Sequence, residues 1–362
     1  MKNFRKHFFI TSAAAISFFI LSFNDIDKNL YTVAGRTEMI DGNIALISPA
    51  SSVTFGFKGD RVDVSLRAQD DTDHHNYVVL ELDGQYYGRF KVTSAGTKLN
   101  VYSTSKKPHT LTVYKATEAA IGTILFKEAI GTIMAAKVTP KKKIEFIGDS
   151  ITVGMGNDTA ETPCGNGSEW YDQHNAYYSY APIAARELKA DYVVNAVSGI
   201  GMYRNWNDEH KDQPTMPQVY ENLYLNRKDD KKYDFGFAPD VTCIALGTND
   251  FSNGDGKKAR LPFNEKEYVD NYVAFINTVY KHSPKTQIIL LNSPMVTGEK
   301  SETFKKCLEQ VKETVNKQAG HKPVVVFTFK DVTPTGCGSH PAIEEDKAMA
   351  AQLAPFLKTY LK

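Results

Sequence analysis

Four positions in this sequence have the side-chain or backbone groups needed for acyl transfer, and each follows an apolar run. They are Ser150 in Gly148-Asp149-Ser150, Gly199 in Ser198-Gly199-Ile200-Gly201, Asn249 in Gly247-Thr248-Asn249-Asp250 and, after a loop, His340 in Ser339-His340-Pro341. A histidine can activate a serine as nucleophile, and backbone or carboxamide N–H groups can stabilise the oxyanion that forms. Taken singly, each residue also suits a turn or a helix cap. Their joint occurrence favours an acyl-transfer site.

The apolar runs predict the sheet that must position these residues. They are 144–148, 192–197, 241–246, 287–292 and 324–329. Runs without polar alternation are typical of strands covered on both faces. Apolar residues at helical spacing lie between or after them, at Tyr268, Tyr272, Phe275, Ile276 and Val279, and again from Leu353 to Tyr360. The alternation predicts a parallel α/β/α domain over 141–362, with these four positions at the carboxyl ends of its strands.

The region before residue 140 has a different pattern. Apolar residues alternate with polar ones in two early runs, Val53–Phe57 and Val62–Leu66, and in a later run at His109–Thr117. A further pair of runs flanks Asp83-Gly84, which is a hairpin signal. Short strands without helical spacing between them predict an antiparallel, jelly-roll-like β-sandwich over 30–138.

The N-terminal segment and the composition define the class of protein. Basic residues followed by an apolar stretch up to Phe23 predict a signal peptide over 1–25, and hence a secreted or periplasmic protein with no stable membrane insertion after cleavage. The formal net charge of +1 gives no basic field for nucleic acid. Of the four cysteines, Cys243 lies in an apolar run and is expected to be buried, and a Cys307–Cys337 disulfide is one possible pairing. No cysteine or histidine spacing indicates a metal site, and no cofactor is expected.

The segments GDSIT, SGIG, GTND and SHP resemble the four blocks of the SGNH (GDSL-type) hydrolases. The region before them, with Gly-Arg near its start and YKATEA near its end, is similar to the N-terminal domain of carbohydrate esterase family 2. The resemblance implies that Ser150 is the nucleophile and that His340 is the general base. It also implies an oxyanion hole formed by the Ser150 N–H, the Gly199 N–H and the Asn249 side chain. A helix that begins after the nucleophile would add to that stabilisation.

The expected site departs from a Ser-His-Asp triad at one position. Many relatives carry an aspartate two or three residues before the histidine, whereas this sequence has Gly338 and Cys337 there. We therefore expect a Ser150–His340 dyad, with a backbone carbonyl as acceptor for the second ring N–H. The carboxylates that could replace the missing aspartate are Asp331, Glu344 and Asp346. Asp149 and Asp250 are expected to order loops.

The resemblance further implies that the substrate is an acetylated polysaccharide such as xylan or glucomannan. Trp170, Tyr171, Tyr203 and Trp206 follow the first two strands, where aromatic faces could stack on sugar rings or pack the loops. Two alternatives remain open. One is an SGNH esterase acting on peptidoglycan acetyl groups or lipid esters, and the other is a non-catalytic carbohydrate-binding protein.

Overall fold

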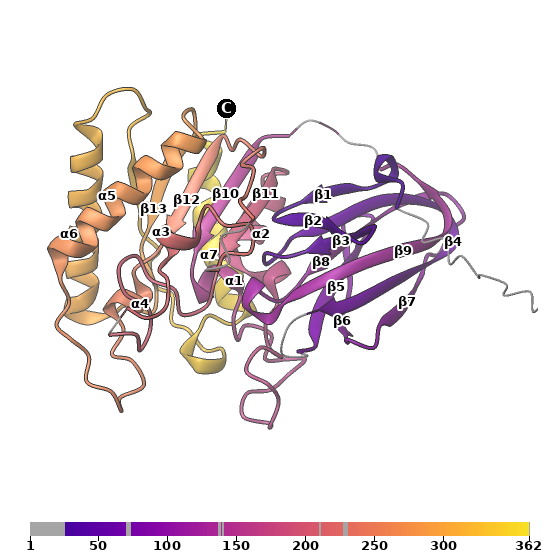
Figure 1. The fold of residues 1–362 in the computed structure, drawn as a ribbon, viewed down its shortest axis with the longest axis horizontal. Coiled ribbons are helices and arrows are strands. Elements are labelled where there is room, and N and C mark those ends of the chain that lie inside the picture. The colour runs from indigo at the N-terminus through magenta and orange to yellow at the C-terminus, as the bar shows by residue number, and fades with distance from the viewer. Residues whose placement is uncertain are drawn as a thin grey trace, which may run out of the picture.

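The computed structural model describes residues 26–69, 74–136, 139, 141–209, 211–226 and 231–361. The expected signal peptide, residues 1–25, lies outside the described residues. Figure 1 shows two bodies side by side, an antiparallel β body and a body in which helices flank a parallel sheet. No helix in the described ranges is long and apolar enough to cross a membrane.

The N-terminal body is one nine-stranded antiparallel sheet in the order β2-β3-β9-β4-β8-β5-β6, with β1 and β7 also paired to β4. The strands are β1 (Thr32–Ala34), β2 (Thr37–Ile40), β3 (Asn43–Leu46), β4 (Ser52–Gln69), β5 (Asn76–Leu82), β6 (Gln85–Val92), β7 (Thr97–Tyr102), β8 (Pro108–Lys115) and β9 (Thr123–Met134). Short 3-10 turns lie at η1 (Lys28–Leu30) and η2 (Ala119–Ile121). The antiparallel class predicted for this region is confirmed.

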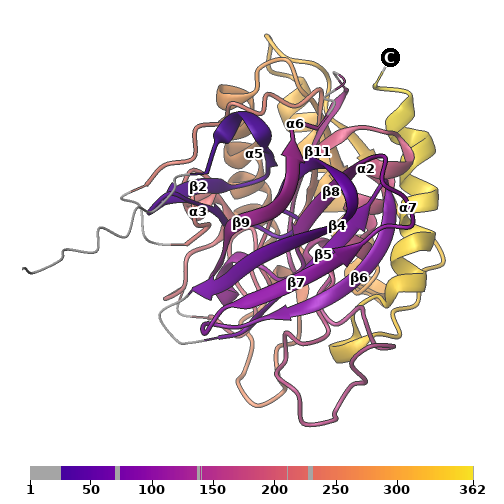
Figure 2. The same ribbon diagram turned by 90° about the vertical axis from the view of Figure 1, so that its right-hand side faces the viewer.

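Strand β4 differs from the sequence prediction in its length. The two alternating runs, Val53–Phe57 and Val62–Leu66, belong to this single strand. Its first half pairs with β8 and its second half with β7, while β9 pairs along both halves with a register shift between them. Because the halves have different neighbours, the sheet turns over on itself and encloses one apolar core. Figure 2 shows the resulting curvature of β4, β5 and β6.

The C-terminal body has a five-stranded, wholly parallel sheet in the order β11-β10-β12-β13-β14. Its strands are β10 (Lys143–Gly148), β11 (Asp191–Ala196), β12 (Val241–Ala245), β13 (Gln287–Leu291) and β14 (Val325–Phe327). The helices are α1 (Ser150–Val153), α2 (Tyr180–Glu187), α3 (Met216–Val219), α4 (Thr248–Phe251), α5 (Glu265–His282), α6 (Gly298–Asn316) and α7 (Ile343–Lys358), with 3-10 turns at η3 (Ala176–Tyr178) and η4 (Cys337–Ser339). Each of the five predicted strand regions overlaps one of these strands.

The two faces of the parallel sheet are covered by different helices. Phe146 and Cys243 face a core formed with α2 and α7, whereas Ile147 and Ile244 face a core formed with α5 and α6. Burial on both faces explains why these strands lack polar alternation. Cys243 is a free, buried thiol, as the sequence predicted. Both helices predicted from apolar spacing are present, as α5 and α7.

A buried arginine ties the two bodies together. Arg36, in the turn between β1 and β2, is fully buried and donates three hydrogen bonds of 2.7 Å to the C-terminal body. The acceptors are the side-chain oxygen of Asn195 in β11 and the backbone oxygens of Tyr220 and Asn222. Asn195 in turn donates to Glu145 in β10 at 2.7 Å. Three of the five N–H groups of the Arg36 guanidinium therefore have a buried acceptor in the C-terminal body.

We expect Arg36→Ala to lower the free energy of unfolding by about 3–5 kcal/mol, because removal of one side of a buried charged network leaves the other side unpaired. Urea unfolding, followed by tryptophan fluorescence, measures this loss. The matched control is Arg67→Ala, which removes an exposed arginine of the same body that donates to Ser94 O. Equal unfolding midpoints for the two variants would contradict the prediction.

Candidate active site

Ser150 lies on the turn between β10 and the single-turn helix α1. Asp149 caps this turn, with its carboxylate accepting the Ile151 N–H at 3.1 Å. A Cβ at Gly148 would come within 2.1 Å of the Thr152 hydroxyl oxygen, so the strand can end this close to the turn only at glycine. The turn presents Ser150 to His340, whose Nε2 is 2.8 Å from the Ser150 Oγ. The structure thus brings together two side chains 190 residues apart in sequence.

The second ring nitrogen of His340 donates to a backbone carbonyl, which confirms the expected acceptor. His340 Nδ1 is 3.0 Å from Gly338 O. With its proton on Nδ1, the neutral ring directs the Nε2 lone pair at the Ser150 hydroxyl. The hydrogen bond is possible because η4 folds back over two residues, with φ of +63° at Gly338.

Two of the three carboxylates that could have completed a triad, Asp346 and Glu344, are engaged elsewhere. Asp346 is buried and accepts hydrogen bonds from Asn157 and the Tyr180 N–H, at 2.9 and 3.0 Å. Glu344 pairs with Lys347 at 2.7 Å on the surface of α7. No carboxylate in the described residues hydrogen-bonds the His340 ring. The geometry is that of a dyad.

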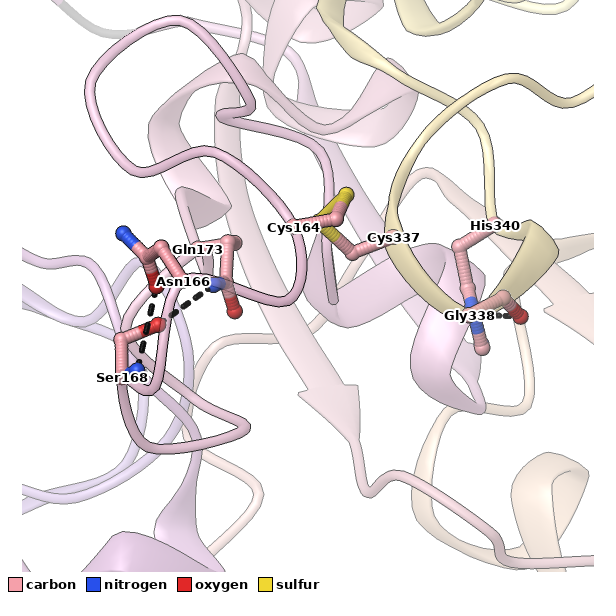
Figure 3. The surroundings of a disulfide bond; sticks show 7 residues. All are labelled: Cys164, Asn166, Ser168, Gln173, Cys337, Gly338 and His340. Carbon is pink, nitrogen blue, oxygen red and sulfur yellow. Dashed lines mark hydrogen bonds between the residues drawn. A yellow bond between two sulfur atoms is a disulfide. The ribbon is translucent and has the colours of Figure 1, made fainter.

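A disulfide holds the histidine loop in place (Figure 3). Cys337, next to the Gly338 whose carbonyl orients His340, is bonded to Cys164 with a Cα–Cα distance of 5.4 Å. The possible Cys307–Cys337 pairing is wrong, because Cys307 is a free thiol buried in the α6 core. Burial raises the pKa of that thiol to about 11. Cys164 lies in a long loop, 173 residues before Cys337, and nothing in the sequence indicated that these two cysteines are bonded.

Three N–H groups that follow the neighbouring strands β10, β11 and β12 have a hydrogen without an acceptor among the described residues. The Ser150 N–H opens α1 and has no intrahelical partner. Asn249 Nδ2 donates one hydrogen to Ile200 O at 2.8 Å and keeps a second one. The third is the Gly199 N–H, which meets no acceptor among the described residues, whereas the other N–H groups from Val197 to Arg204 are all hydrogen-bonded.

The loop that carries Gly199 is fixed by side chains on both sides. The Asp250 carboxylate accepts the consecutive N–H groups of Met202, Tyr203 and Arg204 at 2.9–3.1 Å. The guanidinium of Arg260 donates to Asn249 O at 2.8 Å and so fixes the backbone of the residue that carries the Asn249 donor. Asp250 orders this loop as predicted. No motif or spacing in the sequence indicated this role for Arg260.

The four aromatic residues considered as sugar contacts differ in their exposure to solvent. Trp170 and Trp206 are 48% and 47% exposed, and Trp206 lies next to Gly199, whose carbonyl accepts its backbone N–H at 2.9 Å. Tyr171 and Tyr203 are buried. The Tyr203 hydroxyl accepts the Asn264 N–H at 3.0 Å, so its expected role as a sugar contact is corrected to loop packing. Because these four residues lie in loops, the order of residues in the sequence did not show which rings face the solvent.

Burial controls the charge states at the site. It lowers the pKa of His340, and the nearby His174 lowers it further, while the Gly338 carbonyl opposes the shift. Burial also raises the pKa of Asp149 to about 7, with hydrogen bonding to Thr248 opposing it. A neutral His340 is the form able to accept a proton. Within the described ranges, no group of three or more acidic, cysteine or histidine side chains is arranged to hold a metal ion.

Two protein families match large parts of this chain. Residues 146–354 match the GDSL-like Lipase/Acylhydrolase family, and residues 33–136 match the Carbohydrate esterase 2 N-terminal model. An acetylxylan esterase / glucomannan deacetylase from Cellvibrio japonicus is 34% identical over 60% of this chain. Cellulase/esterase CelE from Acetivibrio thermocellus is 29% identical over 86% of it. These matches span 59% and 37% of the relatives' own lengths.

A solved structure extends the similarity across both bodies. It is a family two carbohydrate esterase from Clostridium thermocellum, in complex with cellohexaose. Its TM-score is 0.79 at 28% sequence identity, and the alignment covers 91% of this chain and 99% of that one. The arrangement of an antiparallel body before the parallel α/β body is therefore shared with this enzyme.

We expect the disulfide to support turnover through the His340 loop. Cys164→Ser/Cys337→Ser should lower kcat for p-nitrophenyl acetate about tenfold or more, since a displacement of about 1 Å at a reacting group can cost 10²-fold. Reduction of the wild type with dithiothreitol should have the same effect. The double variant is the matched control, because the same reductant should leave its rate unchanged. Full activity of the reduced wild type would contradict this role.

We expect kcat/KM to persist on the acid side of neutrality. A lowered His340 pKa keeps the ring neutral, and thus able to act as a base, to a lower pH than an ordinary histidine of pKa about 6.5. The pH profile of kcat/KM for p-nitrophenyl acetate should have its acid half-point below that value. Tryptophan fluorescence at each pH controls for unfolding. A half-point at neutral pH or above would indicate a raised pKa and a hidden carboxylate partner.

Proposed function

Because this chain belongs to carbohydrate esterase family 2, with a GDSL-like SGNH hydrolase body behind that family's N-terminal region, we propose that it removes acetyl groups from plant polysaccharides such as xylan or glucomannan. Ser150 is the nucleophile, and His340 is the general base. The N–H groups of Ser150 and Gly199 and the side chain of Asn249 form the oxyanion hole. The observation that carries the proposal is the 2.8 Å contact between Ser150 Oγ and His340 Nε2.

The chemistry proceeds through an acetyl-enzyme. Ser150 Oγ attacks the acetyl carbonyl carbon while His340 Nε2 takes the hydroxyl proton. The oxyanion of the tetrahedral intermediate is stabilised by the three N–H donors. Collapse of the intermediate breaks the ester bond, and His340 returns its proton to the leaving sugar oxygen. Water, activated by the same nitrogen, then releases acetate and restores Ser150.

The orientation of His340 supports this sequence of proton transfers. The Gly338 carbonyl holds the Nδ1–H, so the imidazolium formed during attack keeps one hydrogen bond to a neutral acceptor. A carboxylate would stabilise that charge more strongly. The lowered pKa of His340 nevertheless keeps the base in its neutral form before attack.

The surroundings of the site support a polysaccharide substrate. Trp206 lies beside Gly199, and Trp170 makes an edge-on contact with the His174 ring, with 5.1 Å between centroids. Both indoles are about half exposed, which leaves flat apolar surface for sugar rings. Of the two relatives above, one is named an acetylxylan esterase / glucomannan deacetylase and the other a cellulase/esterase. The proposal also includes secretion through a signal peptide over residues 1–25. It assigns residues 30–138 to a β-sandwich accessory domain and residues 141–362 to the catalytic domain.

Acetate release from acetylated xylo- and manno-oligosaccharides tests the proposal, with peptidoglycan and lipid esters as competing substrates. Ser150→Ala should leave only background hydrolysis. Asn249→Ala should lower kcat roughly 10²- to 10³-fold with a smaller change in KM, the typical loss for one oxyanion donor. Asn253→Ala, on the exposed side of the same segment, is the matched control. Failure of the wild type to release acetate from the acetylated xylo- and manno-oligosaccharides, or a Ser150→Ala variant that retains turnover, would refute the proposed function.

A further inference from the structure

A glutamate of the N-terminal body reaches the loop that carries Gly199. Glu118 lies between β8 and η2 and is fully buried. Its Oε2 accepts the backbone N–H of Ser198 at 2.6 Å. Ser198 is the residue directly before Gly199, so a side chain of one body fixes the peptide next to an oxyanion donor of the other.

The environment of Glu118 keeps its carboxylate a strong acceptor. Its Oε1 lies 3.4 Å from Nε2 of His174, and both side chains are fully buried. Burial works to raise the Glu118 pKa, but His174 and the Ser198 N–H outweigh it, and the net direction is down. The Lys115 ammonium donates to the Glu118 backbone oxygen at 2.5 Å, which adds a positive charge nearby. A hydrogen bond from an amide to an ionised carboxylate is about twice as strong as a neutral one.

The Ser198 N–H that Glu118 accepts belongs to the Val197–Ser198 peptide, and the peptide after it, which carries the Gly199 N–H, needs such a constraint. Gly199 has a φ of +77°, in a region where glycine moves freely because it has no Cβ. Its carbonyl is fixed by the Trp206 N–H at 2.9 Å, and the residues after it are fixed by Asp250. On the N-terminal side, Glu118 is the one described side chain that hydrogen-bonds the Ser198 N–H. Without it, the Ser198–Gly199 peptide could rotate and turn the Gly199 N–H away from the acyl group.

We propose that Glu118 is a positioning residue of the oxyanion hole, which acts from the N-terminal body by holding the Ser198 N–H and thereby aiming the Gly199 N–H. The inference rests on the proposed esterase function. It assigns the N-terminal body a part in turnover as well as in stability.

A series at Glu118 tests the inference through kcat and KM for p-nitrophenyl acetate. Glu118→Gln keeps an acceptor oxygen at the same reach and loses only the charge, so we expect kcat to fall about three- to tenfold. Glu118→Asp keeps the charge but is one methylene shorter, and Glu118→Ala has no acceptor. For these two we expect kcat to fall about 10²-fold, within the range for loss of one oxyanion donor. KM should change less than about threefold throughout, because Glu118 does not touch the substrate.

The rank order separates positioning from a general effect of charge or stability. An electrostatic role would favour Glu118→Asp over Glu118→Gln, the reverse of what we expect. Glu81→Ala is the matched control, because Glu81 accepts the Tyr177 hydroxyl at 2.8 Å across the same interface without contacting the Gly199 loop. It should lower the unfolding temperature and leave kcat near that of the wild type.

Two results would overturn the inference. One is a folded Glu118→Asp or Glu118→Ala variant with wild-type kcat. The other, which decides the case if those variants do not fold, is a Glu118→Gln variant with undiminished kcat. Activity in the wild type that is lost in Ser150→Ala but kept across the Glu118 series would refute this inference alone. A wild type without esterase activity would instead refute the proposed function on which it rests.

Discussion

The hydrogen bond from His340 Nδ1 to the Gly338 carbonyl is the constraint on which the rest of the site depends. A carboxylate partner attracts an imidazolium over a range of positions, but a carbonyl acts only through a short, directed hydrogen bond. The backbone of the histidine loop must therefore be as fixed as a side chain would be. The Cys164–Cys337 disulfide and the hydrogen bond from the Cys337 N–H to Gly156 O at 2.9 Å supply that rigidity one residue away.

The interface between the two bodies uses the same principle of fixing backbone through buried polar side chains. Arg36 donates to backbone oxygens that follow α3, and Glu118 accepts a backbone N–H that precedes Gly199. Such groups are costly to bury and are retained only where their hydrogen bonds are satisfied. In this chain they connect the antiparallel body to the strand ends where the chemistry would occur. An apolar interface of the same area would hold the bodies together without setting the direction of a single N–H group.

The sequence was sufficient for the elements and for the residues at strand ends, but not for contacts that depend on loop paths. Apolar runs without alternation can be read directly as buried strands, so the parallel sheet and the convergence of Ser150 and His340 were predictable. The bridge to Cys164 and the burial of Tyr203 depend on how long loops fold back, and residue type does not encode this. The merging of two alternating runs into β4 was missed because the polar residues between them resemble a turn.

The role expected for helix α1 also changes once its length is known. A helix that follows a nucleophile can stabilise negative charge through its aligned peptide dipoles. With four residues, α1 aligns too few peptides for a substantial dipole, and it ends at Gly154 in a left-handed conformation. Stabilisation of an oxyanion must then come from individual N–H groups at hydrogen-bonding distance. In the oxyanion hole that we propose, the direction of the Ser150, Gly199 and Asn249 donors is therefore decisive, which is consistent with the side chains that hold the Gly199 loop on both sides.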